Sequence, residues 1–297
     1  MSPLISILTP TWNRRHLLPR LYESLSSQDA PPGSFEWLVI DDGSTDGTVE
    51  WLKTLRTQAS FPIRLFCQEN GGKHRALNRA ASELRTPWVV VVDSDDWLLP
   101  LSVVRSLKQI ERAPLATRAI IAPLFFKNKP IKKFNIYSDN VNFREWMEQK
   151  RWVGDTSYII RSIYHKENRF PEFPEEKFMS EGFFYASIFH NGGIRLSNEP
   201  IVGAEYQPGG LSAMSLQLRS ANPLGALANY EAHLKAGLIG SNKIRNLVNY
   251  HRFLWHARCS DKNPEKYGFT ARKLWLMLGY FPFKLDLWRL SRANISV

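Results

Sequence analysis

The chain of 297 residues is 43% apolar and carries a formal net charge of +11. That apolar content is enough for a substantial buried core, so disorder over most of the chain is excluded. The positive charge favours an anionic partner, which can be a nucleotide, a nucleic acid or an acidic lipid, and does not choose among them. Two cysteines, Cys67 and Cys259, are too few to suggest a disulfide framework or a zinc site.

The first residues lack the basic flank and long apolar stretch of a signal peptide. No run approaches the roughly 18 uninterrupted apolar residues expected of a membrane-spanning helix. We therefore expect a cytoplasmic location. Peripheral association with the inner face of the cell membrane is a further option.

Apolar runs alternate with helical patterns through the first hundred residues, which is typical of a parallel sheet covered by crossover helices. Strands are expected at 4–8, 36–40, 63–67 and 88–92, and helices at 14–27, 47–57 and 73–84. Further strands are predicted at 120–126 and 155–161, and a short helix at 180–190. Residues 127–151 have no clear period and are interpreted as a mobile or acceptor-facing excursion. From residue 222 the pattern is helical.

Acidic residues follow two of the expected strands where each strand ends. Asp41 and Asp42 come after the run 36–40, and Asp93, Asp95 and Asp96 come after the run 88–92. Ligands of open α/β sheets bind outside the carboxyl ends of the strands, so both groups are expected at one site. Carboxylate oxygens suit Mg²⁺ or Mn²⁺, and such an ion neutralises a diphosphate. The pattern indicates an enzyme that acts on a nucleotide diphosphate.

Four motifs occur in order at suitable spacings. They are Leu8-Thr9-Pro10-Thr11-Trp12-Asn13, the run 39–47, Asn70-Gly71-Gly72-Lys73 with Ala76-Leu77-Asn78, and Asp93-Ser94-Asp95-Asp96. Together they resemble an inverting family 2 glycosyltransferase with the GT-A fold, a Rossmann-like, mostly parallel sheet flanked by helices. The resemblance covers roughly residues 3–205 and is strongest up to Trp97.

The resemblance implies roles for the residues of the first two motifs. Thr9, Pro10 and Thr11 would border the nucleoside, and Asp41 would accept hydrogen bonds from the base or the ribose. An ionised carboxylate accepts hydrogen bonds only, which suits the N–H of a uracil-type ring or sugar hydroxyls. Asp42 is open to a second interpretation as a turn cap.

The third and fourth motifs would hold the diphosphate and its metal. Lys73 supplies a positive charge beside glycines that permit close backbone approach. It is not part of a Walker A loop, because the glycine spacing and the Lys-Ser/Thr pair are absent. Asp93 and Asp95 lie two apart and face one side of an extended segment. By resemblance, Asp95 ligates Mn²⁺ or Mg²⁺ directly, whereas Asp93 contacts the ribose or the metal's water shell.

An inverting transfer needs a general base for the acceptor hydroxyl. The family places an acid at the start of a helix well after the metal motif, usually followed by Asp, and this implies Glu181. Gly182 departs from that pattern. Asp155, Glu175 and Glu176 stay open as rivals. The segment 207–212 is interpreted either as a loop that closes over the donor or as an ordinary turn.

The last 57 residues hold most of the excess charge, with eleven Lys or Arg and three acids among bulky apolar residues. Such a mixture suits a helix lying on an anionic membrane surface. A helix that packs on the core and exposes a basic face is the other interpretation. The expected domains are residues 1–220, with a nucleotide-binding half 1–100 and an acceptor half 101–220, and a helical region 221–297.

The sequence thus predicts a metal-dependent inverting glycosyltransferase that moves a hexosyl group from a nucleotide-diphosphate sugar, expected to be UDP-linked, to a glycan or lipid-linked acceptor in cell-surface polysaccharide synthesis. A non-catalytic sugar-nucleotide or glycan-binding protein of the same fold is the alternative, favoured by Gly182 and opposed by the intact acidic motif. Specific nucleic-acid binding is not expected, because no recognised binding motif accompanies the charge.

Overall fold

The computed structural model describes residues 3–135, 138, 140–206 and 214–293, without the side chains of 150–152, 292 and 293. The chain divides into two compact units. The first contains Met1–Arg169 and Asn191–Gln207, and the second contains Phe170–His190 and Pro208–Val297. The predicted boundary at residue 220 stays a prediction, and the segment 207–212 lies outside the described residues. Residues 170–190, which carry Glu181, group with the C-terminal helices.

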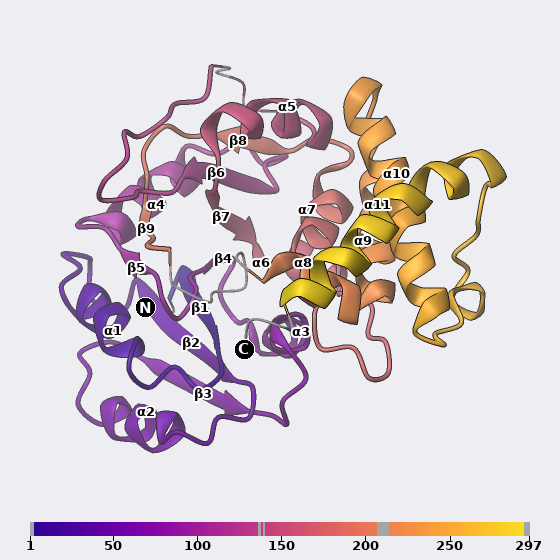
Figure 1. Ribbon diagram of the computed structural model, residues 1–297. Helices are drawn as coiled ribbons and strands as arrows, with labels where there is room; N and C mark the ends of the chain where they lie inside the picture. Colours follow the sequence, from indigo (N-terminus) through magenta and orange to yellow (C-terminus); the bar gives the residue numbers. More distant parts are fainter. Residues whose placement is uncertain (1–2, 136–137, 139, 207–213, 294–297) are drawn as a thin grey trace. The chain divides into compact units, whose positions relative to one another are not determined.

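Among the described residues, the first unit is built on a seven-stranded sheet in the order β3-β2-β1-β4-β7-β6-β8 (Figure 1). All neighbouring pairs are parallel except those that β7 makes with β4 and β6. The mostly parallel α/β sheet predicted from the sequence is confirmed. The strands are β1 (Ile5–Thr11), β2 (Phe35–Asp41), β3 (Ile63–Cys67), β4 (Trp88–Val91), β6 (Ala119–Pro123), β7 (Thr156–Arg161) and β8 (Ile194–Leu196).

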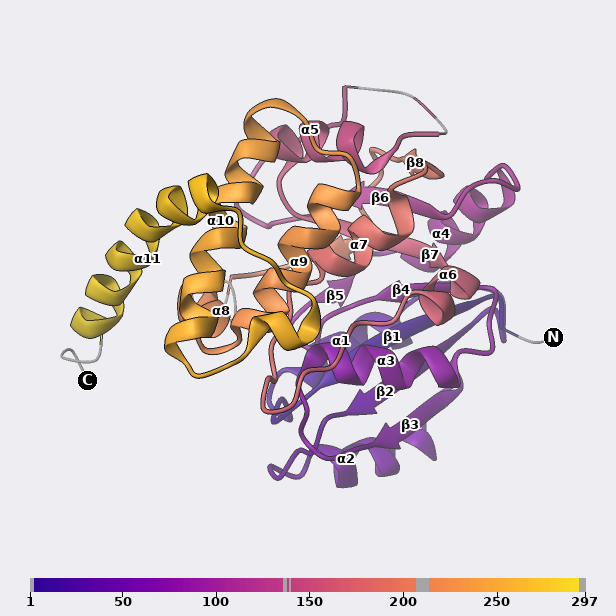
Figure 2. The same cartoon turned by 90° about the vertical axis from the view of Figure 1, so that its right-hand side faces the viewer.

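The first three helices follow the predicted βα alternation closely, and a fourth, at Ser102–Glu111, was not predicted. They are α1 (Leu18–Ser26), α2 (Thr48–Arg56), α3 (Lys73–Glu83) and α4 (Ser102–Glu111), and Figure 2 shows α3 lying along the sheet. Every residue of β1 and β2 is buried, because both strands lie between neighbours and under helices. The core around them includes Trp37, Leu21 and Val90.

The stretch 127–151, which has no clear period, contains the start of a helix, α5 (Phe143–Val153). Asn142 and Glu145 form a reciprocal capping box at its beginning, since each backbone N–H donates to the other's side-chain oxygen at 2.9 and 3.0 Å. This capping pair is the local signal that periodicity missed. The short strands β5 (Trp97–Leu98) and β9 (Val202–Gly203) pair separately, and short helix α6 (Ser162–Glu167) follows β7.

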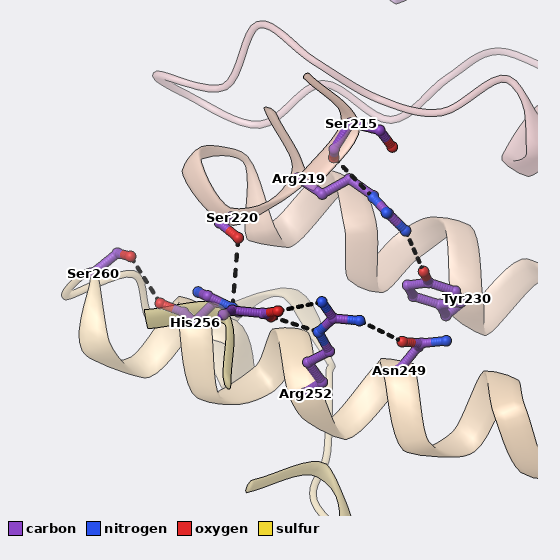
Figure 3. A network of polar contacts seen from close by, with 9 residues as sticks. Ser215, Arg219, Ser220, Tyr230, Asn249, Arg252, His256 and Ser260 are labelled. Atoms are coloured by element: carbon purple, nitrogen blue, oxygen red, sulfur yellow. Dashed lines mark hydrogen bonds and ion pairs between the residues drawn. The ribbon is translucent and has the colours of Figure 1, made fainter. Parts of the chain in front are cut away.

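The second unit is helical, which confirms the predicted helical C-terminus. Its elements are α7 (Gly182–Phe189), α8 (Ser215–Ala221), α9 (Pro223–Lys235), α10 (Gly240–Cys259), the 3₁₀ turn η1 (Pro264–Tyr267) and α11 (Lys273–Ala293). Polar contacts tie these helices together, as Figure 3 shows around Arg219 and Arg252. Arg219 donates to the Tyr230 hydroxyl at 2.7 Å, which links α8 to α9.

Candidate donor and metal site

The carboxyl ends of three parallel strands form one edge of the sheet, with β1 between β2 and β4. Thr11, the last residue of β1, pairs in register with Asp41, the last residue of β2. On the other side of β1, the Val92 N–H donates to the Leu8 carbonyl at 2.9 Å and carries the pairing to the residue before Asp93. The sheet therefore brings the acids of both sequence clusters to the same edge.

Two buried oxygens at this edge have no hydrogen-bond partner among the described residues. Asp41 is only 1% exposed, and its Oδ1 accepts the Ser44 N–H at 2.9 Å, whereas its Oδ2 is unpaired. The Thr11 Oγ1 is also buried and unpaired. An unmade hydrogen bond to a buried polar group is costly, so such groups call for a ligand or water. The pair offers one acceptor-only carboxylate oxygen and one hydroxyl.

Asp42 organises the glycine loop that precedes α3. Its carboxylate accepts hydrogen bonds from the backbone N–H groups of Gly71 and Gly72, at 3.0 and 2.7 Å. The side-chain amides of Gln68 and Asn70 donate to it as well, at 2.7 and 3.2 Å. Four donors occupy this buried carboxylate, which agrees with the interpretation of Asp42 as a turn cap. The spacing of the motifs does not predict that Gln68 donates to Asp42.

A second set of contacts joins the loop after β1 to the loop after β2. The Asn13 N–H donates to Ser44 Oγ, and the Thr45 N–H donates to Asn13 Oδ1, both at 2.8 Å. Asn13 has a positive φ of 51°, a conformation that Asn tolerates better than most residues. The Asp46 carboxylate accepts the Arg15 and Thr48 N–H groups at 2.9 and 3.1 Å. The N-cap position of α2 is Gly47, and the side chain of the preceding residue, Asp46, supplies the capping oxygen.

The acids after β4 form the cluster that the sequence predicts. Carboxylate oxygens of Asp93, Asp95 and Asp96 all lie within 4.8 Å of one another. Burial, followed by the charges of Asp93 and Asp95, raises the pKa of Asp96 to about 8. Like charges this close disfavour full ionisation, and a bound cation relieves that repulsion. Oxygen ligands of this kind fit Mg²⁺ or Mn²⁺.

Lys73 is the first residue of α3 and faces the acidic cluster. Its Nζ lies 2.5 Å from Asp93 Oδ1 in a partly exposed ion pair. Gly72, the N-cap, has φ 95° and ψ 157°, a conformation that only glycine adopts readily, so the loop needs glycine at this position. The loop therefore delivers a cation and a helix N-terminus to the edge that carries the acids, and both features attract phosphate.

Thr9 and Pro10 lie deeper in the fold than Thr11. Thr9 is fully buried, and its Oγ1 accepts a hydrogen bond from the Trp37 indole at 3.0 Å. That contact fixes β1 to β2. Pro10 pairs in register with Ile40 and is buried as well. The structure brings five of the predicted residues to one edge of the sheet: Thr11, Asp41, Lys73, Asp93 and Asp95. That Thr9 and Pro10 border the nucleoside stays a prediction.

Glu181 belongs to the second unit and immediately precedes α7. The Tyr185 hydroxyl donates to Glu181 Oε2 at 2.8 Å. A Cβ at Gly182 would lie 2.7 Å from both Asn229 Oδ1 and His233 Nε2 on α9. A side chain at the position that departs from the family pattern would therefore require Asn229 and His233 to shift. Asn229 Oδ1 has no hydrogen-bond partner within the described part of the chain.

The three rivals of Glu181 have different surroundings. Glu176 is buried and accepts the Leu224 and Gly225 N–H groups and the Lys262 ammonium group, at 2.7 to 2.9 Å. These donors make it a cap for α9. Glu175 is exposed with a φ of 64°. Asp155 belongs to the first unit, where it accepts the Tyr206 hydroxyl at 2.9 Å.

The model of Glycosyl transferase family 2 matches residues 6–187. The chain therefore belongs to this family, and the suspected resemblance is confirmed. It is 32% identical over 93 residues to poly(ribitol-phosphate) beta-N-acetylglucosaminyltransferase TarS of Staphylococcus aureus, a match that covers 31% of this chain and 16% of TarS. It is 26% identical over 262 residues to chondroitin synthase of Pasteurella multocida, which covers 88% of this chain and 22% of the synthase.

Solved structures confirm the GT-A fold. A crystal structure of S. aureus TarS 1-349 in complex with UDP-GlcNAc has a TM-score of 0.62 and 18% identity, with 96% of this chain and 81% of that chain covered. The mannosyltransferase PcManGT from Pyrobaculum calidifontis, in complex with GDP-Man and Mn²⁺, has a TM-score of 0.56 and 16% identity, with 99% and 88% covered.

The matches to the first curated relatives span well under half of their length, 16% for TarS. Within the described residues, no helix combines the length and the apolar character needed to cross a bilayer.

Proposed function

We propose that this protein is a metal-dependent inverting glycosyltransferase that moves a hexosyl group from a UDP-sugar to a glycan or lipid-linked acceptor. The observation that carries the proposal is the combination at one sheet edge of an unpaired buried Asp41 oxygen, a cluster of three carboxylates and the Lys73 cation. These groups match the three parts of the donor, which are the nucleoside, the divalent ion and the diphosphate.

The residues present fit a divalent cation, because three carboxylates within 4.8 Å supply hard oxygen ligands. Burial and, after it, the neighbouring carboxylates Asp93 and Asp95 raise the pKa of Asp96, and a cation would relieve that repulsion. Asp95 would hold Mn²⁺ or Mg²⁺ directly, with Asp93 toward the ribose or the water shell. When bound, the ion stabilises the negative charge of the leaving diphosphate.

The chain's own residues would divide the remaining work. Asp41 Oδ2 and Thr11 Oγ1 would bind the nucleoside, with Thr9 and Pro10 behind them as the wall of β1. Lys73 would move its charge from Asp93 to the diphosphate. Glu181 would accept the proton of the acceptor hydroxyl as that oxygen attacks the anomeric carbon from the side opposite the leaving group, which inverts the centre.

The donor nucleotide is proposed to be uridine diphosphate. TarS is known in complex with UDP-GlcNAc, whereas PcManGT is known with GDP-Man, so the family fold alone admits both nucleotides. A single unpaired carboxylate oxygen suits the single imide N–H of uracil. Guanine presents adjacent donors on its ring and exocyclic nitrogens, and one oxygen satisfies them less well.

For the acceptor, we propose a glycan or lipid-linked saccharide of cell-surface polysaccharide synthesis, used at the inner face of the cell membrane. Support comes from two relatives, a poly(ribitol-phosphate) beta-N-acetylglucosaminyltransferase and a chondroitin synthase, and from the basic C-terminal region. The predicted domains, with the acceptor half at 101–220 and a membrane-associating region at 221–297, are part of this proposal.

The second candidate function is a non-catalytic sugar-nucleotide or glycan-binding protein, which Gly182 favours. The two candidates are separated by incubating the purified protein with a panel of UDP- and GDP-sugars, with Mn²⁺ or with EDTA, and measuring free nucleotide. We expect slow, metal-dependent release of UDP from one or a few UDP-sugars. Binding of a UDP-sugar without any release, with or without an acceptor extract, would support the second candidate.

A further inference from the structure

Helix α11 carries an exposed apolar stripe that follows helical spacing. Phe281, Met277 and Leu274 are 77%, 70% and 66% exposed, and Leu278, Leu285 and Trp288 are at least 44% exposed. The spacing of 274, 278, 281, 285 and 288 alternates between four and three residues, so these side chains line one face. Exposed apolar residues scattered singly are ordinary, but a continuous stripe of this size marks an interaction surface.

The opposite face of α11 accounts for its attachment to the second unit. Gly279 lies against α10, where a Cβ would come within 2.7 Å of the Arg252 backbone nitrogen. Phe283 is buried and packs edge-to-face on His256. Figure 2 shows α11 at the outside of α10, with its last turns continuing beyond it. These contacts are made by the inward face of the helix.

The charges of α11 are separated between the two faces. Its one acid, Asp286, is fully buried and pairs with Arg252 and with His256. Lys273, Lys284 and Arg289 are exposed. Among the described side chains of this helix, the surface beside the apolar stripe therefore carries positive charge without a compensating acid.

We propose that the outward face of α11, made of the apolar stripe with Lys273, Lys284 and Arg289, docks on an anionic lipid surface with the helix axis parallel to the membrane plane. Leu, Phe and Trp side chains enter the boundary between headgroups and acyl chains, while Lys and Arg contact anionic headgroups. A second copy of the chain is disfavoured as the occupant, because it would place the same basic residues against one another without acids between them.

The membrane location in the proposed function rests on this surface. Binding of the surface to lipid, however, does not require catalytic activity. We therefore test it without substrate, by co-sedimentation of the full chain with vesicles of phosphatidylcholine alone or mixed with phosphatidylglycerol. The wild type is expected to pellet with the mixed vesicles, to stay in solution with phosphatidylcholine, and to be released by high salt.

Two variants test the two halves of the surface separately. Phe281→Asp places a charge in the apolar stripe, and the triple variant Lys273→Glu, Lys284→Glu and Arg289→Glu reverses the basic charge. Each is expected to lower the apparent vesicle affinity by about tenfold or more. Leu115→Asp is the matched control, since Leu115 is 94% exposed in the other unit, and it is expected to bind as the wild type does.

Circular dichroism and thermal unfolding serve as the folding control for each variant. We expect every variant to be folded, because the changed side chains are exposed. Wild-type affinity in either folded variant would overturn the proposal, and so would equal binding to neutral and anionic vesicles. Sedimentation velocity is the remaining check. A dimer of the wild type that Phe281→Asp converts to monomer would show that a second copy covers this face.

Discussion

Thr11 and Asp41 lie opposite each other at the ends of β1 and β2, and each holds a buried oxygen without a hydrogen-bond partner in the described part of the chain. Two such groups at neighbouring positions are a structural cost that a bound nucleoside would remove. The relationship also explains why the strand end is acidic, although a buried carboxylate is otherwise unfavourable.

The first prediction follows from this pair. Asp41→Asn keeps the size of the side chain and the oxygen that accepts the Ser44 N–H, but it offers an N–H₂ group where Asp41 Oδ2 faces the ligand. We expect the binding free energy of UDP to weaken by roughly 1–3 kcal/mol, which is about 5- to 150-fold in affinity. Isothermal titration calorimetry measures it. Asp29→Asn, at an exposed aspartate after α1, is the control and should bind UDP normally.

A second prediction concerns the glycine loop. Asp42→Asn replaces one carboxylate oxygen by an N–H₂ group that faces the donors of the loop, including the Gly72 N–H. The expected loss is about 1–3 kcal/mol in the free energy of unfolding, measured with urea, together with weaker UDP binding. Unchanged stability would show that the four hydrogen bonds of Asp42 do not hold this loop.

For the proposed base, the third prediction separates binding from turnover. Glu181→Gln should leave the UDP affinity unchanged and lower kcat by at least about 10²-fold, because the amide cannot take the acceptor proton. Glu175→Gln is the matched control on an exposed rival and should keep full activity. An active Glu181→Gln enzyme would transfer the role of base to another residue.

The fourth prediction concerns pH and the second unit. Burial alone would raise the pKa of Asp286, but hydrogen bonds and positive charge from His256 and Arg252 outweigh it, and the pKa is lowered from 3.8. A lowered folded-state pKa gives stability that is present above the unfolded value and is lost as the pH falls through the folded value. The unfolding free energy of the wild type should therefore decline as acidification proceeds below about pH 4.

Asp286→Asn should remove that part of the acid dependence and, at neutral pH, cost roughly 3 kcal/mol, because it leaves the largely buried Arg252 without its carboxylate. Urea unfolding across pH values measures both effects. Glu265→Gln, at the exposed ion pair with Arg258, is the control and should change stability little. An equal acid dependence in Asp286→Asn and the wild type would contradict the assignment.

The sequence was most informative where local pattern and fold agree. The βα alternation up to Val91 and the acids at the strand ends were predictable, because period and strand-end chemistry are local signals. The helix α5 was missed, although the Asn142 and Glu145 capping pair at its start is a local signal. The antiparallel direction of β7 was not predicted either, because strand direction depends on long-range pairing.

The candidate site shows the same limit. The motifs predicted that Asp41, Lys73 and Asp95 belong to one site. Only the structure shows that one oxygen of Asp41 has no hydrogen-bond partner among the described residues, whereas both oxygens of Asp42 accept hydrogen bonds. Likewise, Gly182 in the sequence was only a departure from a pattern. The positions of Asn229 and His233 around it come from helix packing that no local motif encodes.

The central claim is that acids at neighbouring strand ends bind a nucleotide diphosphate through a divalent cation, and calorimetry of UDP binding with Mn²⁺ or with EDTA tests it most directly. The wild type should bind UDP far more tightly with Mn²⁺, and Asp95→Ala should lose that difference while Asp29→Ala, an exposed control, retains it. Equal UDP affinity of the wild type with Mn²⁺ and with EDTA, or an intact Mn²⁺ effect in Asp95→Ala, would contradict the account.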